Sequence, residues 1–565
     1  MTATITIANP ILRGMHPDPS WIWDDGLRQI VLVTSTFELV PGLPIYVSED
    51  MAHWKHVSNA IDEGMARRLL IPFVDDSGGV YAPTLRRIHG KYVIACTIAR
   101  LNDRNAMEGG CSESELMRFR AAAGNFVLEA DSIGGPWRGP FWIEGAEGID
   151  PDIFEDGDGN VYWTQTRPAA SPQWEGQTEV WTQRIDPETW TFVDDGLPAG
   201  SGKTIIWRGY GVEAVWAEAP HLYRVGDYVY LMTAEGGTSF EHSEMAMRIY
   251  APHGLLRAFD AYERDASEAG ERIPQVRDGE RCYLGMDVRA FHADKKNPIL
   301  THRHLGLSEP LQCVGHADLL LHPELGWWVV CLGVRETRGE DDGELLSYLG
   351  RESFVTPVSW EHNPADWKLD GNGTLSTHKG DPGWPVTCAG LGRLPDEITV
   401  TIDGGDIAIE LGTKSSSADD VKPVLMDVTD DSTDYVVVRD ERDVRYRRIA
   451  ALPTLMPIPA SGSLMVRQNS THYAVFSMRG ADVRYETVDG GDSQAGSVAA
   501  MRADGTRPAV LFDDNHLSII MAGGHGSVDS STFVRQGQVL LSIDARFLST
   551  ERAGGFVGCM AGFMA

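Results

Sequence analysis

The chain has 565 residues, too many for one ordinary hydrophobic core, so we expect at least two domains. Hydrophobic residues make up 42% of the chain and aromatic residues 9%, values typical of a globular protein. Its 49 Lys and Arg against 81 Asp and Glu give a net charge of 49 − 81 = −32, which disfavours nucleic acids and anionic membranes as partners and suits a neutral one.

The N-terminal stretch MTATITIANPILRG contains no basic segment followed by an apolar one, so no signal peptide is expected. No apolar run reaches the length of a membrane span. The seven cysteines are odd in number and form no CxxC pair, which argues against a disulfide framework and a structural zinc site. We therefore expect a reduced, cytoplasmic protein.

The first stretch of interest is HPDPSWIW, residues 16–23, which holds Asp18 between Pro17 and Pro19. Each proline fixes its own φ and pushes the residue before it toward extended geometry. Asp18 is thus expected to be held stiffly at the mouth of a strand. A single loop aspartate more often forms a local turn, so the surroundings must decide its role.

The pattern that starts at Asp18 recurs along the first half of the chain. The five copies are DPSWIWDDGLRQIVLVTST at 18–36, APTLRRIHGKYVIACTIA at 82–99, DPDIFEDGDGNVYWTQT at 150–166, APHLYRVGDYVYLMTAE at 219–235 and, more loosely, HADLLLHPELGWWVVCLG at 316–333. Each copy is a short strand, a Gly- or Asp-containing turn and a second strand rich in aromatic and β-branched residues. Each therefore predicts a β-hairpin.

The spacing of the copies predicts the fold. Their second residues are Pro19, Pro83, Pro151, Pro220 and Ala317, at intervals of 64, 68, 69 and 97 residues. About 65 residues suffice for a four-stranded sheet with loops, so five copies favour a five-bladed β-propeller. A β-sandwich with coincidental hairpins is the alternative, which the near-constant interval disfavours. The long last interval contains an insertion at 243–297 with charged, partly helical patterning.

The opening position of each copy carries the functional signal. It holds Asp18, Asp150, His316 and Ala82, the last preceded by Tyr81, and Glu218 stands one residue before it in the fourth copy. The first strand of each blade lines the propeller axis, so these side chains are expected to converge on one funnel. Mutual repulsion and burial would raise the pKa of at least one of the three carboxyl groups. Three acids at matched positions favour an active site over a structural role.

Paired carboxylates without a metal-ligand cluster or a nucleophilic Ser or Cys motif suit glycoside hydrolysis. One carboxyl group protonates the leaving oxygen, and the other activates water or attacks carbon. A third acid beside them can keep the proton donor protonated and oriented. No HExxH or GxSxG motif stands in a convincing strand–turn–helix context.

Eight ordered motifs carry a family resemblance: NPILRGMHPDPSWI, TSTFELVPGLPIYVSEDMAHW, GGVYAPTLR, GIDPDIFEDGDGNVYW, AEAPHLYRVGDYVYLMTAEGGT, NPILTHRHL, VGHADLL and LGRESF. Together they make nearly all of residues 8–360 resemble glycoside hydrolase family 43. The resemblance implies a five-bladed propeller and an inverting β-xylosidase or α-L-arabinofuranosidase, with no cofactor required for the chemistry.

The resemblance also implies residue roles. Asp18 matches the general base, Glu218 the general acid and Asp150 the acid that tunes and orients the proton donor. His316, in GHADL, matches an axial histidine that approaches a structural Ca²⁺ through water. Arg351, in GRESF, resembles an arginine that contacts sugar hydroxyls.

Further residues are candidates for the sugar subsite. Phe37, in TSTF, resembles an aromatic wall, although an isolated phenylalanine is more often core. Tyr81 stands in YAP where the family often has WAP, and EAP replaces the usual EGP, so the shape of the subsite is open. Thr238 and Glu235 follow a blade strand and can reach the sugar. For His242, lining the site and bonding a loop are equally open.

The second half of the chain has a different pattern. We predict a propeller at residues 1–365, a Gly-, Asp- and Pro-rich connector at 366–389 and an all-β domain at 390–565, most simply a sandwich. SLMVRQNSTHYAVFSM and GGFVGCMAGFMA resemble the jelly-roll-like C-terminal domain of the β-xylosidase type. A loop of that domain can close one side of the pocket, but the sequence does not identify the loop.

The sequence therefore predicts an inverting exo-glycosidase that releases terminal α-L-arabinofuranose, β-D-xylose or both from arabinoxylan- or xylan-derived oligosaccharides. Three alternatives stay open: an endo-arabinanase, a retaining fructosidase-like propeller and a non-catalytic sugar-binding propeller. HPDPS stands where the fructosidase type carries a WMNDPNG-like box. The choice between arabinose and xylose, the linkage and the oligomeric state are not predicted.

Overall fold

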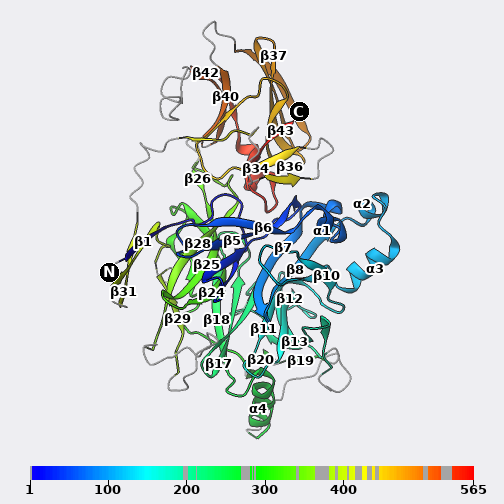
Figure 1. The fold of residues 1–565 in the computed structure, drawn as a ribbon, viewed down its shortest axis with the longest axis vertical. Helices are drawn as coiled ribbons and strands as arrows, with labels where there is room; N and C mark the ends of the chain where they lie inside the picture. The colour runs from blue at the N-terminus through cyan, green and yellow to red at the C-terminus, as the bar shows by residue number, and fades with distance from the viewer. Residues whose placement is uncertain are drawn as a thin grey trace.

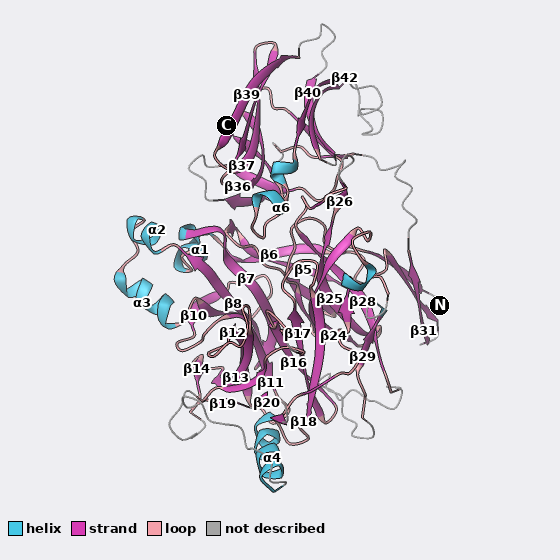
Figure 2. Ribbon diagram, turned by 180° about the vertical axis from the view of Figure 1, so that it is seen from behind, coloured by secondary structure: helices cyan, strands magenta, loops and turns pink. Residues whose placement is uncertain are grey.

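The computed structural model describes residues 3–194, 202–211, 213–268, 280–282, 284–285, 288–338, 343–362, 381–388, 392–403, 406–413, 423–428, 435–438, 444–500, 507–513, 515–522 and 538–564. Strands dominate throughout, and the few helices lie at the edges (Figure 2). In those ranges, no helix is both long and apolar enough to span a bilayer.

Five antiparallel sheets make up the larger domain, each with its first four strands ordered outward from the first. They are β2 (Ser20–Asp24), β3 (Gln29–Val33), β5 (Gly42–Ser48), β6 (Lys55–Ile61); β7 (Val74–Ile88), β8 (Lys91–Leu101), β9 (Asn125–Ala130), β10 (Arg138–Trp142); β11 (Ile149–Glu155), β12 (Val161–Pro168), β13 (Thr178–Asp186), β15 (Thr204–Trp207); β16 (Glu218–Val225), β17 (Tyr228–Glu235), β18 (Ser243–Tyr250), β22 (His292–Ala293); and β24 (Leu311–His322), β25 (Gly326–Arg335), β28 (Arg351–Trp360), β29 (Pro385–Thr387).

The five first strands contact one another in a closed ring, in the order β2, β7, β11, β16, β24 and back to β2. Each space between neighbouring blades is filled by its own cluster of buried apolar side chains. Trp163 and Trp181, for example, pack between the second and third blades, and Trp21 and Trp328 between the fifth and first. The predicted five-bladed propeller is confirmed.

Shorter elements decorate the blades. They are the helices α1 (Glu63–Arg68), α2 (Asp103–Glu108), α3 (Glu113–Ala121) and α4 (Leu255–Glu268), the 3₁₀ turns η1 (Ile71–Phe73) and η2 (Arg303–Leu305), and the strands β14 (Thr191–Phe192), β19 (Arg281–Cys282), β20 (Leu284–Gly285), β21 (Val288–Arg289), β23 (Leu300–Thr301), β26 (Thr337–Arg338) and β27 (Leu345–Leu346). The helix α4 lies in the insertion predicted from the sequence, where helical patterning was expected. It projects from the end of the propeller away from the second domain (Figure 1).

The second domain is a sandwich of two sheets. One sheet runs β39 (Asp492–Ala499), β38 (Asp482–Asp489), β37 (His472–Arg479), β36 (Ser463–Asn469), β43 (Met560–Met564), β34 (Arg445–Arg448), β33 (Tyr435–Val438) and β4 (Leu39–Val40), and the other β32 (Val424–Leu425), β35 (Thr454–Pro457), β40 (Arg507–Asp513), β41 (His516–Ala522) and β42 (Gln538–Asp544). One apolar cluster fills the space between them, which confirms the predicted sandwich. A short 3₁₀ turn, η6 (Arg546–Leu548), and the helix α6 (Thr550–Ala553) precede β43.

The boundary between the two halves contains more pairing than a plain linker. Within the predicted connector, β29 pairs with β28 of the fifth blade, whereas residues 366–380 and 389 lie outside the described residues. Near the start of the second predicted domain, β30 (Glu397–Asp403) pairs with both β31 (Asp406–Gly412) and the N-terminal β1 (Ala3–Ala8). Ile398 and Val400 of β30 pack against the cluster between the fifth and first blades.

The two domains meet over the first, second and fifth blades. The strand β4, from the propeller, pairs with β33 and so extends a sheet of the sandwich. An apolar cluster joins the domains, with Met15, Phe37 and Leu39 on one side and Tyr446, Met465 and Val557 on the other. The second domain consequently covers one end of the propeller (Figure 1).

Candidate active site

The first strands of four blades open with the same backbone device. Asp18, Asp150, Ala219 and His316 all lie in the left-handed region, with φ of 52°, 57°, 47° and 53°. In β11, β16 and β24 the pairing register shifts just after this residue. Such a bulge bends the strand and re-aims its side chains, here toward the axis.

The flanking prolines led us to expect an extended backbone at Asp18, but the residue lies in the left-handed region. The repeated bulge overrides the local preference of a residue that precedes proline, and aspartate tolerates the left-handed region better than most side chains. Backbone strain of this kind persists only where the surrounding structure fixes it, and it clusters at functional sites.

The Asp18 carboxylate is held in its ionised form. Ser35 donates its Oγ hydrogen to Asp18 Oδ2 at 2.6 Å, and Arg351 Nη1 donates to Oδ1 at 3.0 Å. The Nδ1 atom of His316 lies 3.6 Å from Oδ1. Although burial alone would raise it, Arg351, His316 and Ser35 hold the pKa of Asp18 below its ordinary value.

Glu218 and Asp150 have the opposite electrostatic character. Burial raises the pKa of Glu218, and the neighbouring charges of Asp150 and Asp18 raise it further. Burial and the charge of Asp18 likewise raise the pKa of Asp150. Because the charge of Asp150 acts on Glu218, this pair retains a proton at a pH where an ordinary carboxyl group has lost it. The backbone N–H of Ala219 donates to Asp150 Oδ2 at 3.2 Å, which ties Asp150 to the start of the strand that carries Glu218.

Arg351 connects the predicted subsite residues. Besides Asp18, its Nη1 donates to Thr238 Oγ1 at 3.2 Å. Its guanidinium carbon lies 5.3 Å from the ring centroid of Phe37 and 5.3 Å from that of Phe556. The Phe37 and Phe556 rings stack on each other with centroids 5.8 Å apart, and Tyr81 meets both rings edge-on.

The structure brings the predicted site residues together. Phe37, Tyr81, Thr238 and Arg351 form one connected group with Asp18. His242 is buried, and its Nδ1 lies 2.8 Å from the carbonyl oxygen of Cys313. Its ring also lies against Gly315, where an added Cβ would approach within 2.9 Å. His242 thus bonds the strand β24 of the next blade, and the charges of Arg351 and Asp18 act on its ring.

Phe556 comes from the second domain and could not be identified from the sequence. The residue before it, Gly555, has a φ of 92°, and a Cβ there would lie 2.3 Å from Ser77 Oγ. The backbone N–H of Phe556 donates to Ser77 Oγ at 2.9 Å. Ser77 also accepts the Tyr81 hydroxyl hydrogen at its carbonyl oxygen, at 2.8 Å. Ser77 therefore holds both Tyr81 and Phe556 by hydrogen bonds near the start of the second blade.

Ser35, Ser77 and Phe556 are the site residues that the sequence reasoning missed. Ser35 lies two residues before Phe37 in the motif TSTF, so the motif itself carried a signal for it. Phe556 lies in GGFVGCMAGFMA, whose resemblance indicated only a domain.

Residues 7–257 match the model of glycosyl hydrolases family 43. The matched residues are a family 43 glycoside hydrolase domain. It is 32% identical over 410 residues to a xylosidase/arabinosidase of Butyrivibrio fibrisolvens, which covers 72% of this chain and 61% of that relative. It is 33% identical over 358 residues to the non-reducing end alpha-L-arabinofuranosidase BoGH43B of Bacteroides ovatus, which covers 63% of this chain and 52% of that relative. The chain thus spans between half and two thirds of the length of the curated relatives that it matches.

Solved family 43 structures share the fold of the whole chain. A GH43_12 protein retrieved from capybara gut metagenome superposes with a TM-score of 0.67 at 20% identity, covering 99% of this chain and 94% of that one. The Bacteroides ovatus xyloglucan PUL GH43B gives 0.63 at 24% identity, covering 99% and 95%.

Two other acids on the fourth blade are poorly suited to proton donation. Glu235 is buried, and its carboxylate accepts hydrogen bonds from Trp207 Nε1 at 2.8 Å and from the backbone N–H of Tyr210 at 2.8 Å. Those bonds give it a structural role. Glu213 is exposed on the loop before β16.

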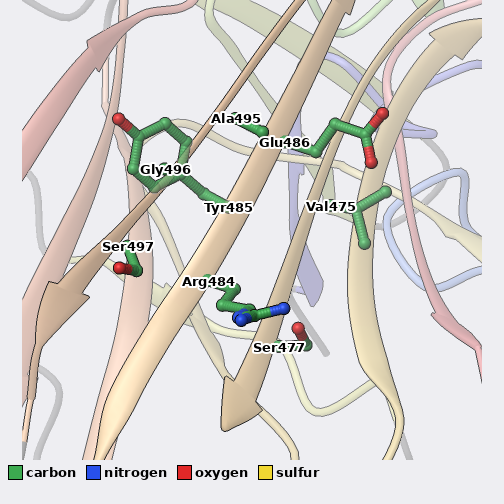
Figure 3. A pocket seen from close by; sticks show the side chains of 8 residues that line it. All are labelled: Val475, Ser477, Arg484, Tyr485, Glu486, Ala495, Gly496 and Ser497. Carbon is green, nitrogen blue, oxygen red and sulfur yellow. The ribbon is translucent and has the colours of Figure 1, made fainter.

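A hollow of about 450 Å³ lies on the second domain, away from these carboxylates. It is lined by Val475, Ser477, Arg484, Tyr485, Glu486, Ala495, Gly496 and Ser497 from β37, β38 and β39 (Figure 3). Glu486 is the one carboxylate in its lining, so the hollow lacks the pair that glycoside hydrolysis needs.

Proposed function

We propose that this chain is an inverting, exo-acting glycoside hydrolase that releases terminal α-L-arabinofuranose, β-D-xylose or both from arabinoxylan- or xylan-derived oligosaccharides. The observation that carries the proposal is the opposite tuning of two carboxyl groups in one funnel, with Asp18 held ionised and Glu218 held protonated. The names of the relatives, a xylosidase/arabinosidase and an arabinofuranosidase, support the substrate class.

In the proposed reaction Glu218 donates its proton to the glycosidic oxygen as the bond from that oxygen to the anomeric carbon breaks. A water on the opposite face of the sugar forms the new bond to carbon, and Asp18 accepts the proton that the water loses. Asp150 keeps Glu218 protonated through its charge and orients it through Ala219. Proton exchange with solvent then restores both carboxyl groups.

The exo-action rests on the wall around the site. Phe556 from the second domain stacks on Phe37, and Arg351 lies against both rings. A wall fixed from two domains favours a pocket for a chain end over an open groove for a polymer. We further propose a neutral oligosaccharide as substrate and a cytoplasmic location, which suits short imported chains.

The chemistry proposed here requires no cofactor, since both proton transfers use carboxyl groups of this chain. The sequence also predicts a structural Ca²⁺ near His316, but the residues around this histidine do not fit that ion. Calcium takes six to eight oxygen ligands, whereas the charges that act on His316 include one carboxylate, Asp18, together with the cationic Arg351 and the imidazoles of His221 and His242. In the part of the chain that the structure describes, no three His, Cys, Asp or Glu side chains are grouped to hold a metal.

The test of the proposal is the substitution Glu218→Ala. A sugar alkoxide needs a proton in order to leave, whereas p-nitrophenolate, with a pKa of roughly 7, leaves with little help. We expect Glu218→Ala to lose about a hundred- to ten-thousand-fold in kcat on xylo- and arabino-oligosaccharides and much less on p-nitrophenyl pentosides.

The matched control is Glu213→Ala, which removes an exposed acid from the loop before the same strand and should leave both activities unchanged. Equal losses of Glu218→Ala on both substrate types, in a folded variant, would show that Glu218 is not the proton donor. Sugar binding by the unaltered protein without sugar release would instead favour the non-catalytic propeller.

A further inference from the structure

A buried ion cluster lies on the propeller axis next to the active site. The guanidinium of Arg86, on β7, places Nη2 3.0 Å from Asp152 Oδ1 and Nη1 2.9 Å from Asp318 Oδ2. Both carboxylates have no exposed side-chain surface, and the Arg86 side chain is 15% exposed. One cation is thus shared between two fully buried anions from different blades.

All five blades contribute to this cluster. Ser20 of the first blade donates its Oγ hydrogen to Asp318 Oδ2 at 2.6 Å, and its Oγ lies 3.4 Å from Arg86 Nη1. Arg86 comes from the second blade, Asp152 from the third and Asp318 from the fifth. The fourth blade supplies Tyr223, whose hydroxyl donates to Asp318 Oδ1 at 2.6 Å, and His221, whose Nδ1 lies 3.2 Å from Arg86 Nη2.

The remaining acceptor capacity of the two anions is used by the backbone of other blades. The N–H of Trp21 donates to Asp318 Oδ2 at 3.2 Å, and the N–H of Leu222 donates to Asp152 Oδ2 at 3.0 Å. A buried carboxylate that is fully hydrogen-bonded and paired tolerates burial, whereas one whose partner is removed does not. The buried charges of the cluster are therefore paired when Arg86 is present, and two buried carboxylates lose their cation when it is removed.

The cluster is in register with the active site. Its members Ser20, Asp152, His221 and Asp318 follow Asp18, Asp150, Ala219 and His316 by two positions in the same strands. These first strands line the axis and the offset is the same in all four, so the cluster forms the next layer along the axis. Displacing Arg86 would shift the strand ends that carry the reacting carboxylates.

We propose that Arg86 is a built-in axial cation: its guanidinium supplies the positive charge that the buried carboxylates of Asp152 and Asp318 require, and it positions the catalytic layer beside it. Three consequences follow. The wild-type protein needs no divalent cation for stability. Loss of the Arg86 side chain leaves a cation-sized gap between Asp152 and Asp318. An added cation then refills this gap.

The experiment measures melting temperature and metal content. Wild-type protein dialysed against a chelator should keep its melting temperature and contain no stoichiometric metal by elemental analysis. Arg86→Ala should melt about 5–15 °C lower because it strands two buried carboxylates. Guanidinium or Ca²⁺, each at about 5 mM, should raise the melting temperature of Arg86→Ala and not of wild type.

The matched control is Arg87→Ala. Arg87 is the next residue on β7, its side chain is 40% exposed, and it pairs with Asp24 at 3.2 Å away from the axis. It should show a small loss of stability and no response to either cation. A wild-type melting temperature that falls on chelation would overturn the proposal. So would an Arg86→Ala variant that has the same melting temperature as Arg87→Ala and responds to neither cation.

If Arg86→Ala does not fold, a pair of milder variants decides. Arg86→Gln combined with Asp318→Asn removes one cation and one anion and should melt higher than Arg86→Gln alone. The reverse order would contradict charge compensation as the role of Arg86.

The positioning role rests on the proposed function and is read from kinetics alone. Arg86→Lys keeps the charge but not the fork that spans both carboxylates. In the folded variant we expect kcat to fall up to about a hundredfold with KM nearly constant. An unchanged kcat would remove the positioning role, while the melting and metal data would still stand on their own.

Discussion

Two carboxyl groups of similar chemistry face one funnel in this chain, and single neighbouring residues separate their pKa values. Asp18 has a cationic arginine and a hydroxyl donor within hydrogen-bond distance. Burial and the charges of two other acids act on Glu218, and no hydrogen bond from the described residues contributes to its pKa shift. The proposed roles of base and acid therefore rest on the surroundings of the two groups rather than on residue type.

The raised pKa of Glu218 predicts a pH-dependent gain in stability for Glu218→Gln. Well below the ordinary pKa of about 4.3, Glu218 is protonated in the folded and unfolded states alike, so it adds no penalty. As pH rises through that value, the unfolded chain loses the proton first, and the penalty grows until the folded pKa is passed. The melting temperature of Glu218→Gln relative to wild type should thus rise from pH 4 to pH 9.

The control for this measurement is Glu213→Gln, which neutralises an exposed acid in the same loop region. It should give a flat difference across the same pH range. A flat difference for Glu218→Gln as well would mean that the folded protein does not raise the pKa of this group.

At the residue scale, the sequence predicts the acids and misses the aromatic wall residue Phe556 for a physical reason. Asp18, Asp150 and His316 recur at one position of a repeat, and a repeat in a propeller converts sequence spacing into proximity. Phe556 belongs to no repeat, and its place beside Phe37 depends on how two domains pack. The roles assigned to the predicted residues stay predictions until they are tested.

At the element scale, the loop around Gly555 of the second domain packs against Ser77 near the start of β7. Gly555 and Ser77 both have positive φ, at 92° and 56°, and a Cβ added at Gly555 would lie 2.3 Å from Ser77 Oγ. Ser77 uses its backbone N–H, its carbonyl and its hydroxyl, bonding Glu38, Tyr81 and Phe556 in turn. Each group of this serine thus fixes a different part of the wall.

This loop predicts a set of variants that change substrate-length preference. Gly555→Ala introduces a Cβ against Ser77 Oγ and should push Phe556 away from Phe37, and Phe556→Ala removes the ring altogether. Both should raise KM for disaccharides by about tenfold, since one stacking contact is lost, while longer chains are cleaved relatively better. KM and kcat across oligosaccharides of increasing length provide the measurement.

Ser470→Ala is the matched control for the loop variants. It removes a different hydrogen bond between the domains, the one that the Ser470 hydroxyl donates to Asp76, without touching Phe556. Its length preference should equal that of wild type. If it shifts in the same way as Gly555→Ala, the effect comes from domain packing in general and not from the aromatic wall.

The hairpins of the propeller were predictable because each is local: two strands and a turn lie within about twenty residues of one another. The pairings of β4 with β33 and of β1 with β30 were not, because they join segments hundreds of residues apart that carry no complementary local signal. The same limit explains why the wall residue Phe556 required the structure.

At the scale of the whole molecule, the second domain covers the end of the propeller where the first strands open. The apolar cluster that contains Phe37, Tyr446 and Val557 is continuous with the aromatic wall. The contact between the domains consequently also shapes the wall of the site. The sandwich therefore contributes to the site as well as to stability.

This architecture predicts both the products and their stereochemistry. A pocket closed on one side admits a chain end and excludes the middle of a polymer, so the products should be monosaccharides from the first turnover onward. In the proposed mechanism the base on the first blade and the acid on the fourth act from opposite faces of the sugar, and inverting enzymes keep their carboxyl groups about 6.5–9.5 Å apart to admit a water. Proton NMR of the first-formed pentose should therefore show the anomer opposite to that of the substrate. Chromatography of digests of linear arabinan or xylan should show no oligosaccharide released by internal cleavage. Retention of configuration would favour the fructosidase-like alternative, and internal cleavage the endo-arabinanase. A Phe556→Ala variant is informative in the same assay, because opening the wall should relax the requirement for a chain end while leaving inversion intact.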